Sequence, residues 1–118
     1  DLVINKLFDI KPIYYYFDKD NIREDASVEL DKVVQILKDN PQIKLELGSH
    51  TDVRGVDIYN LDLSQRRARS AVQYILSRGI DPSRITAKGY GEKQLIIKNA
   101  KTEEQHQTNR RTEFKVVQ

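Results

Sequence analysis

Hydrophobic and polar positions along the chain follow two different spacings. Between Asp25 and Asn40 the apolar residues recur at steps of three and four, which predicts an amphipathic helix. Residues 43–47 alternate strictly between apolar and polar, which is typical of a strand with one buried face. A second apolar stripe at helical spacing runs from Ala68 to Leu76. We therefore expect two helices that pack against a sheet.

Strand and turn signals assign the segments around these elements. The aromatic and β-branched run from Ile10 to Phe17 predicts a first strand. The second helix is expected to begin at Ser64, a good N-cap residue, and to end at Gly79. These bounds leave residues 48–63 as a loop, and loops of that length are usually functional or disordered.

The last third of the chain predicts two more strands, over residues 84–88 and 112–116, with a bend at 89–92. The element order is then β-α-β-α-β-β. We expect an α+β sandwich, a mixed four-stranded sheet with the helices packed on one face. No internal boundary divides residues 1–118, so we expect a single domain, the C-terminal part of a longer protein.

Composition excludes several classes of function. The 118 residues contain no cysteine, which removes disulfide scaffolds, thiol nucleophiles and cysteine-based zinc sites. No stretch approaches the roughly 20 apolar residues that span a bilayer. The net charge of +2 is too small to predict nucleic-acid binding. We expect no metal site and no cofactor, since His50 and His106 are the only histidines.

Arginines near the expected start of the second helix conflict with the helix dipole. Cations are unfavourable there by about 0.3–1 kcal/mol each, and Arg67 lies beside the apolar stripe. An enclosed guanidinium in that place implies a negative partner, either a protein carboxylate or a bound anion. Asp52 follows the carboxyl end of a predicted strand, where ligands collect in α/β sheets. Asp52 is either the ion-pair partner of Arg67, or the two flank a pocket and hold a zwitterion.

Other polar residues give weaker signals. His50 and Asp52 could share a face of the loop, but no third group completes a triad. His106 falls in a polar stretch and is expected at the surface. Residues 109–111, Asn-Arg-Arg, could contact nucleic acid, although a polar strand edge explains them better.

Several spaced motifs resemble one known family. The central pattern is Gly48-x-x-Thr51-Asp52-x-x-Gly55-x-x-x-Tyr59-Asn60-x-x-Leu63-Ser64-x-x-Arg67-Ala68. It continues in Gly89-Tyr90-Gly91-Glu92 and in Asn109-Arg110-Arg111-Thr112-Glu113-Phe114, and Phe17-Asp18 precedes it. Together these motifs cover roughly residues 10–118 and resemble the OmpA-like peptidoglycan-binding domain. The chain departs from the pattern at Leu95 and over residues 96–108.

The resemblance implies non-catalytic binding of the diaminopimelate residue of a peptidoglycan stem peptide. It makes Asp52 the acidic ligand residue and Arg67 the basic one. It also places five residues around the same pocket: Phe17, Asp18, Thr51, Asn60 and Leu63. The implied partner is peptidoglycan, on the periplasmic side of an outer membrane that is reached through a missing barrel or lipid anchor.

Two hypotheses from other classes compete with this expectation. One is an enzyme acting on the cell wall with Asp52 or Glu92 as general acid, although glycoside cleavage normally needs two carboxylates. The other is an α/β module that binds nucleic acid through residues 109–111, which would make its binding strongly dependent on salt.

Overall fold

The computed structural model describes residues 2–117. Its first long helix forms where the apolar stripe is uninterrupted. Helix α1 (Glu24–Asp39) buries Leu30, Val33 and Leu37 completely. Acidic residues occupy its first turn and a lysine its last, which complements the helix dipole. The helix ends before Asn40-Pro41 because proline disfavours helical geometry in the residue that precedes it. The helix predicted over 25–40 is confirmed to within one residue.

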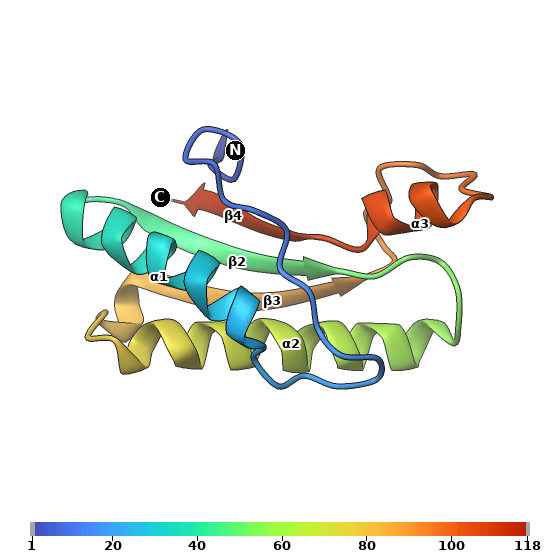
Figure 1. The fold of residues 1–118 in the computed structure, drawn as a ribbon, viewed down its shortest axis with the longest axis horizontal. Helices are drawn as coiled ribbons and strands as arrows, with labels where there is room; N and C mark the ends of the chain where they lie inside the picture. The colour runs from blue at the N-terminus through green and yellow to red at the C-terminus, as the bar shows by residue number, and fades with distance from the viewer. Residues whose placement is uncertain (1, 118) are drawn as a thin grey trace.

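The sheet is mixed and has four strands in the order β1-β4-β2-β3. They are β1 (Leu2–Val3), β2 (Lys44–His50), β3 (Ile85–Gly91) and β4 (Thr112–Val117). Strand β2 pairs antiparallel with β4 and parallel with β3. Helix α1 and helix α2 (Asp57–Ser77) cover one face of this sheet (Figure 1). The predicted α+β architecture, with a mixed four-stranded sheet and helices on one face, is confirmed.

The core lies between that face and the two helices. Alternate residues of the strands point into it, among them Leu45, Leu47 and Phe114, all fully buried. The helices contribute small and branched side chains, so α2 packs closely through Ala71 and Ile75. Among the helices formed by residues 2–117, none is both long and apolar enough to cross a membrane.

The first strand is not the one that the sequence predicted. Residues 10–17 form no strand, and the edge of β4 is instead paired by β1, with Leu2 opposite Val116. The segment crosses the sheet towards α2 (Figure 1). The Ile10 and Ile13 side chains are buried in the core and anchor the segment. The aromatic and β-branched run therefore misled the prediction, because its buried residues Ile10 and Ile13 pack into the core from an irregular segment and not from a strand.

The second helix begins at Asp57, seven residues before the predicted N-cap at Ser64. Ser64 is buried inside α2, where its hydroxyl oxygen accepts a hydrogen bond from the Gly91 amide at 2.9 Å. The predicted loop over 48–63 is consequently wrong. It divides into the end of β2, a short connection over 51–56 and the first two turns of α2.

Strand β3 runs through the glycines that were predicted as a bend. A Cβ atom on Gly89 would lie 2.2 Å from the Gln65 backbone nitrogen, so glycine is required where α2 crosses the strand. Gly91 has a positive φ of 57° and lies against Leu61. The two glycines let α2 approach the sheet end at which the candidate site is built.

A third helix, α3 (Glu103–Asn109), lies in the polar stretch before β4 and was not predicted. Its start is fixed by a capping box, in which Thr102 and Gln105 satisfy each other's backbone amides. His106 and Asn109 point inward and are buried, so the expectation that His106 lies at the surface is wrong. Helix α3 lies beyond the carboxyl end of β2, away from the two long helices (Figure 1).

Candidate functional site

A cavity of about 700 Å³ lies at the carboxyl end of β2. The 51–56 connection, the start of α2, helix α3 and the crossing segment around residues 13–18 enclose it. The seven residues expected at a common pocket all line it: Phe17, Asp18, Thr51, Asp52, Asn60, Leu63 and Arg67. Segments far apart in the sequence thus meet at one sheet end, where ligands commonly bind in α/β folds.

Asp52 is positioned by the short connection that follows β2. The Thr51 amide donates to the Gly91 carbonyl oxygen at 2.9 Å, which ties the connection to β3. The Asp52 carboxylate accepts from the backbone amide of Arg54 at 2.8 Å, a local turn that aspartate commonly makes. The connection then bends at Gly55, whose φ is +96°. The carboxylate is therefore held in a fixed direction by its own loop.

Two arginines neutralise Asp52. Arg54 Nη2 lies 2.9 Å from Asp52 Oδ2, and Arg110 Nη1 also donates to Oδ2. The Asp52 side chain is only 8% exposed, and burial alone would raise its pKa. The hydrogen bonds from Arg54 and Arg110 outweigh burial and lower the pKa of Asp52 to about 2. Asp52 is therefore ionised throughout the physiological pH range.

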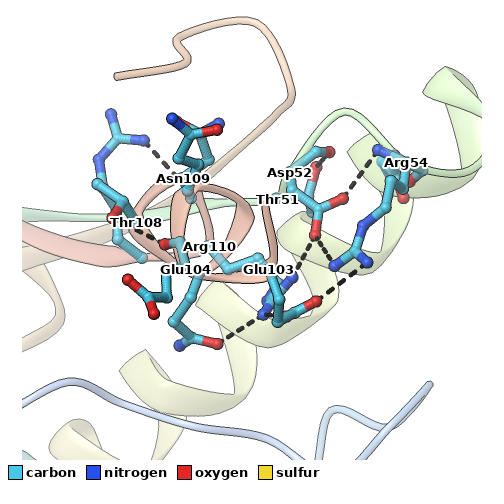
Figure 2. Close-up of polar contacts among 12 residues, drawn as sticks. Thr51, Asp52, Arg54, Glu103, Glu104, Thr108, Asn109 and Arg110 are labelled. Atoms are coloured by element: carbon cyan, nitrogen blue, oxygen red, sulfur yellow. Dashed lines mark hydrogen bonds and ion pairs between the residues drawn. The ribbon is translucent and has the colours of Figure 1, made fainter. Parts of the chain in front are cut away.

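Glu103 closes a four-membered ion-pair network with Asp52, Arg54 and Arg110. Its carboxylate accepts from Arg54 Nη1 at 3.1 Å and from Arg110 Nη2. Figure 2 shows both acids joined to both arginines by dashed lines. Arg54, Glu103 and Arg110 were not predicted from the sequence as members of the site. The Asn-Arg-Arg motif was the available signal for Arg110, but 58 residues separate it from Asp52.

Arg67 has different partners. Its Nε donates to the Lys19 carbonyl oxygen at 2.9 Å and its Nη2 to the Tyr16 carbonyl oxygen at 3.3 Å. Its guanidinium lies over the Tyr15 ring, 4.8 Å from the centroid. Burial lowers the pKa of Arg67, although an arginine remains charged at any physiological pH. Among residues 2–117, no carboxylate lies within ion-pair distance of it.

The two readings of Arg67 can now be separated. Asp52 is not its ion-pair partner, because the Asp52 carboxylate is bound by Arg54 and Arg110. The argument from the helix dipole is wrong, since Arg67 lies ten residues after Asp57, the first residue of α2, and the dipole acts only within the first turn. The half-buried guanidinium lines the cavity, where no carboxylate of residues 2–117 lies within ion-pair distance of it and Asp18 and Asp20 act on it only from further away.

The remaining predicted residues shape the cavity in different ways. Asn60 is buried and donates to the Arg54 carbonyl oxygen at 2.9 Å, so it fixes the connection after β2. Leu63 is buried and gives an apolar wall. Phe17 is 95% exposed at the rim. Asp18, in a left-handed turn with φ of 60°, is exposed beside it.

The polar run over residues 109–111, before β4, makes contacts within the molecule. Asn109 is fully buried, and its side-chain oxygen accepts from the amides of Ile96 and Ile97, each at 2.9 Å. Arg111 pairs with Glu113 at 3.0 Å. Residues 109–111 thus make internal contacts that join α3, the 94–97 segment and the sheet end.

His50 also lines the cavity, and its Nε2 lies 3.6 Å from Glu113 Oε1. Its ring stacks on Tyr90, with 4.7 Å between centroids. Burial lowers the pKa of His50 to about 4, so the ring is neutral at pH 7. Within residues 2–117, no group of three or more His, Cys, Asp or Glu side chains could hold a metal ion.

The chain is similar to known proteins over most of its length. The OmpA family model matches residues 14–110. Outer membrane porin F of Pseudomonas fluorescens is 37% identical over 114 residues, which cover 97% of this chain and 34% of that protein. The peptidoglycan-associated lipoprotein of Brucella melitensis is 36% identical over 84 residues, 71% of this chain and 50% of the lipoprotein. The chain therefore spans between a third and a half of the length of these relatives.

A solved structure agrees with the fold. The crystal structure of the peptidoglycan-associated lipoprotein from Burkholderia pseudomallei superimposes with a TM-score of 0.79 at 26% identity, and the match covers 91% of each chain.

Proposed function

The chain belongs to the OmpA family, and from that premise we propose that it binds peptidoglycan through the diaminopimelate residue of the stem peptide. The far end of this residue carries an ammonium group and a carboxylate on one carbon. In the proposed complex Arg67 binds the carboxylate and Asp52 receives the ammonium group. Phe17, Asp18, Thr51, Asn60 and Leu63 form the walls around them.

The observation that carries the proposal is the state of Arg67. A half-buried guanidinium with no carboxylate of the described residues within ion-pair distance carries a desolvation cost, which the more distant Asp18 and Asp20 offset only in part. A ligand carboxylate would remove that cost, and a guanidinium can donate two parallel hydrogen bonds to it. The backbone contacts to Lys19 and Tyr16 hold the side chain in place beforehand, so little side-chain entropy is lost on binding.

Asp52 suits the ammonium end because it is ionised and fixed. Its pKa of about 2 keeps the negative charge at any physiological pH. The charge is shared with Arg54 and Arg110, so the ammonium group would add to an existing network and gain only moderate energy. We expect dissociation constants between micromolar and millimolar, about 4–8 kcal/mol of binding free energy.

The same chemistry predicts selectivity. A stem peptide with lysine in place of diaminopimelate keeps the ammonium group but lacks the second carboxylate. Arg67 would then be desolvated without a partner, and the loss of a hydrogen bond to a charged group costs about 1.5–3 kcal/mol. That range corresponds to roughly 10- to 150-fold weaker binding.

The proposed role is non-catalytic attachment. A general acid must hold a proton near neutral pH, whereas the pKa of Asp52 is about 2. Glu92, the other acid considered, accepts from Asn60 at 3.4 Å and is not among the residues that line the cavity within residues 2–117. The relatives include an outer membrane porin and a peptidoglycan-associated lipoprotein. We therefore propose that the chain ties an outer-membrane protein or lipoprotein to the cell wall, on the periplasmic side.

Titration of the chain with a diaminopimelate-containing muropeptide, followed by NMR, tests the proposal. Amide signals of Thr51 and of residues around Leu63 should shift with saturation. Asp52→Ala and Arg67→Ala should each weaken binding by at least about tenfold, so that the shifts saturate only at much higher ligand concentration, while the circular dichroism spectrum stays native.

Arg66→Ala is the matched control. Arg66 precedes Arg67 on α2 and pairs with Asp62 and Asp20 outside the cavity, so this variant should bind as wild type does. Full binding by both site variants would refute the proposal, and release of soluble fragments from purified wall would revive the enzymatic hypothesis.

A further inference from the structure

The ion-pair network has an inner and an outer acid, and they differ in exposure. The inner acid, Asp52, has a side chain that is 8% exposed, whereas the Glu103 side chain is 63% exposed. Arg54 and Arg110 each direct one terminal nitrogen to Asp52 and the other to Glu103 (Figure 2). The donors on the outer side are Arg54 Nη1 and Arg110 Nη2.

Those two donors make a site for one carboxylate. They belong to different guanidinium groups, so they can bind both oxygens of a carboxylate at once, and both oxygens of Glu103 are bound in this way. The site opens to the cavity, because Arg54, Glu103 and Arg110 all line it. Arg54 and Arg110 are also held from behind by the buried Asp52, so they would keep their positions if Glu103 turned away.

Glu103 is the most exposed member of the network, and its side chain is not what anchors α3. It is the first residue of α3, and the helix is anchored by other contacts. The capping box of Thr102 and Gln105 fixes its start, and the buried Asn109 fixes its end through the amides of Ile96 and Ile97. Rotation of the Glu103 side chain into solvent breaks its ion pairs with Arg54 and Arg110, and the pair with Arg54 is exposed on both sides and therefore weak.

We propose that Arg54 and Arg110 form a second carboxylate site for the ligand, and that Glu103 occupies it as an internal competitor. The inference rests on the proposed function, since it adds a subsite to the same cavity. Arg67 and Asp52 hold one amino-acid end of the ligand. The second site takes a further carboxylate of that ligand, which displaces Glu103. The carboxylate comes either from the other end of diaminopimelate or from elsewhere on the stem peptide.

Substitution of Glu103 separates competition from structural support. In Glu103→Gln the competing charge is gone and the side-chain shape is kept, so we expect free diaminopimelate to bind about three- to tenfold more tightly, measured by NMR titration or calorimetry. Glu104→Gln is the control, because it removes the same charge from the next position of α3. Glu104 is exposed, and among residues 2–117 its carboxylate forms no ion pair, while its backbone carbonyl oxygen accepts from Thr108 Oγ1.

The outcomes separate a failure of the second carboxylate site from a failure of the proposed function. Equal or weaker binding by Glu103→Gln relative to Glu104→Gln, with wild-type binding intact, would overturn the second site and leave the proposed function standing. Failure of wild type to bind diaminopimelate or a muropeptide would overturn both. Arg54→Gln should remove the gain when it is combined with Glu103→Gln, and a gain that persists in this double variant would also contradict the inference.

The source of the carboxylate follows from the choice of probe. A diaminopimelate amidated at the end away from the clamp should lose the gain in Glu103→Gln if that end supplies the carboxylate. A muropeptide amidated at the same position should keep the gain if another carboxylate of the stem supplies it. A carboxylate site would be contradicted if neither amidated ligand lost the gain. It would also be contradicted if lysine whose carboxylate is amidated, and which therefore carries no carboxylate, showed an equal gain.

Discussion

Replacement of Asp52 by asparagine should destabilise the fold as well as weaken binding. The substitution keeps the shape of the side chain but leaves Arg54 and Arg110 facing each other without the acid between them. The pKa of the Asp52 carboxyl falls from 3.8 to about 2 in the folded protein. Each unit is worth 1.36 kcal/mol, so the ionised carboxylate stabilises the fold by about 2 kcal/mol at pH 7.

The pH dependence of this effect has a definite sign. Because the pKa of Asp52 is lower in the folded than in the unfolded chain, its stabilisation is present above pH 4. It is lost as the pH falls through about 2. The difference in unfolding free energy between wild type and Asp52→Asn should therefore be about 2 kcal/mol at pH 7 and shrink below pH 4. Contributions from other titrating groups cancel in that difference as long as they are unaffected by the substitution.

Urea denaturation followed by circular dichroism measures both quantities. Asp62→Asn is the control, because Asp62 makes an exposed ion pair with Arg66, one turn further along α2. Pairs of that kind contribute a few tenths of a kcal/mol. If Asp52→Asn were as stable as this control at pH 7, or if its deficit persisted unchanged to pH 2, the ion-pair network would not stabilise the site as described.

Three further substitutions test other parts of the structure by denaturation. Burial lowers the His50 pKa to about 4, so between pH 6.5 and 4 only the unfolded chain takes up the proton and the wild type loses up to about 3 kcal/mol of stability. His50→Phe should remove this loss. A pH profile of stability that is the same in both proteins would contradict the prediction. Gly89→Ala should cost more than about 3 kcal/mol, since its Cβ would lie 2.2 Å from the α2 backbone, and a near-neutral effect would be inconsistent with that contact. Asn109→Ala should cost about 1–3 kcal/mol by leaving the Ile96 and Ile97 amides unpaired, and native stability would show that they find other partners.

Elements were predictable wherever burial and apolar character coincide. Helix α1 and the centre of β2 have continuous apolar patterns, and both were placed correctly to within a few residues. The start of α2 was missed because its buried stripe continues through Asn60 and Ser64, which are polar but satisfied by the neighbouring connection and by β3. A search for apolar periodicity stops at such residues. Helix α3 carried a visible capping box at Thr102 that was overlooked.

The site was predictable as a set of positions and not as a set of contacts. Family resemblance picked seven residues that the fold brings to one cavity, and their role in binding remains a prediction. The partners of Asp52 could not be predicted from spacing, because Arg110 is 58 residues away in the sequence. It lies between α3 and β4, and the antiparallel pairing of β4 with β2 brings it near Asp52. Arg67 was chosen for the wrong physical reason, since it lies in the middle of α2 rather than at its start.

Arg67 also holds the turn at Tyr16 and Lys19, so weakened binding in an Arg67 variant could reflect a displaced turn. A structural role would weaken diaminopimelate and lysine equally, whereas a role in reading the carboxylate would weaken diaminopimelate alone. The comparison therefore has to be made as a ratio of affinities.

The most direct measurement is the ratio of diaminopimelate to lysine affinity, by calorimetry or NMR titration with matched muropeptides, in wild type and in Arg67→Gln. The account predicts a ratio of about 10 to 150 in wild type, from the loss of one charge-assisted carboxylate contact, and a ratio near one in the variant. Equal affinities in wild type, or a preference that survives in Arg67→Gln, would contradict the claim that Arg67 recognises the ligand's carboxylate.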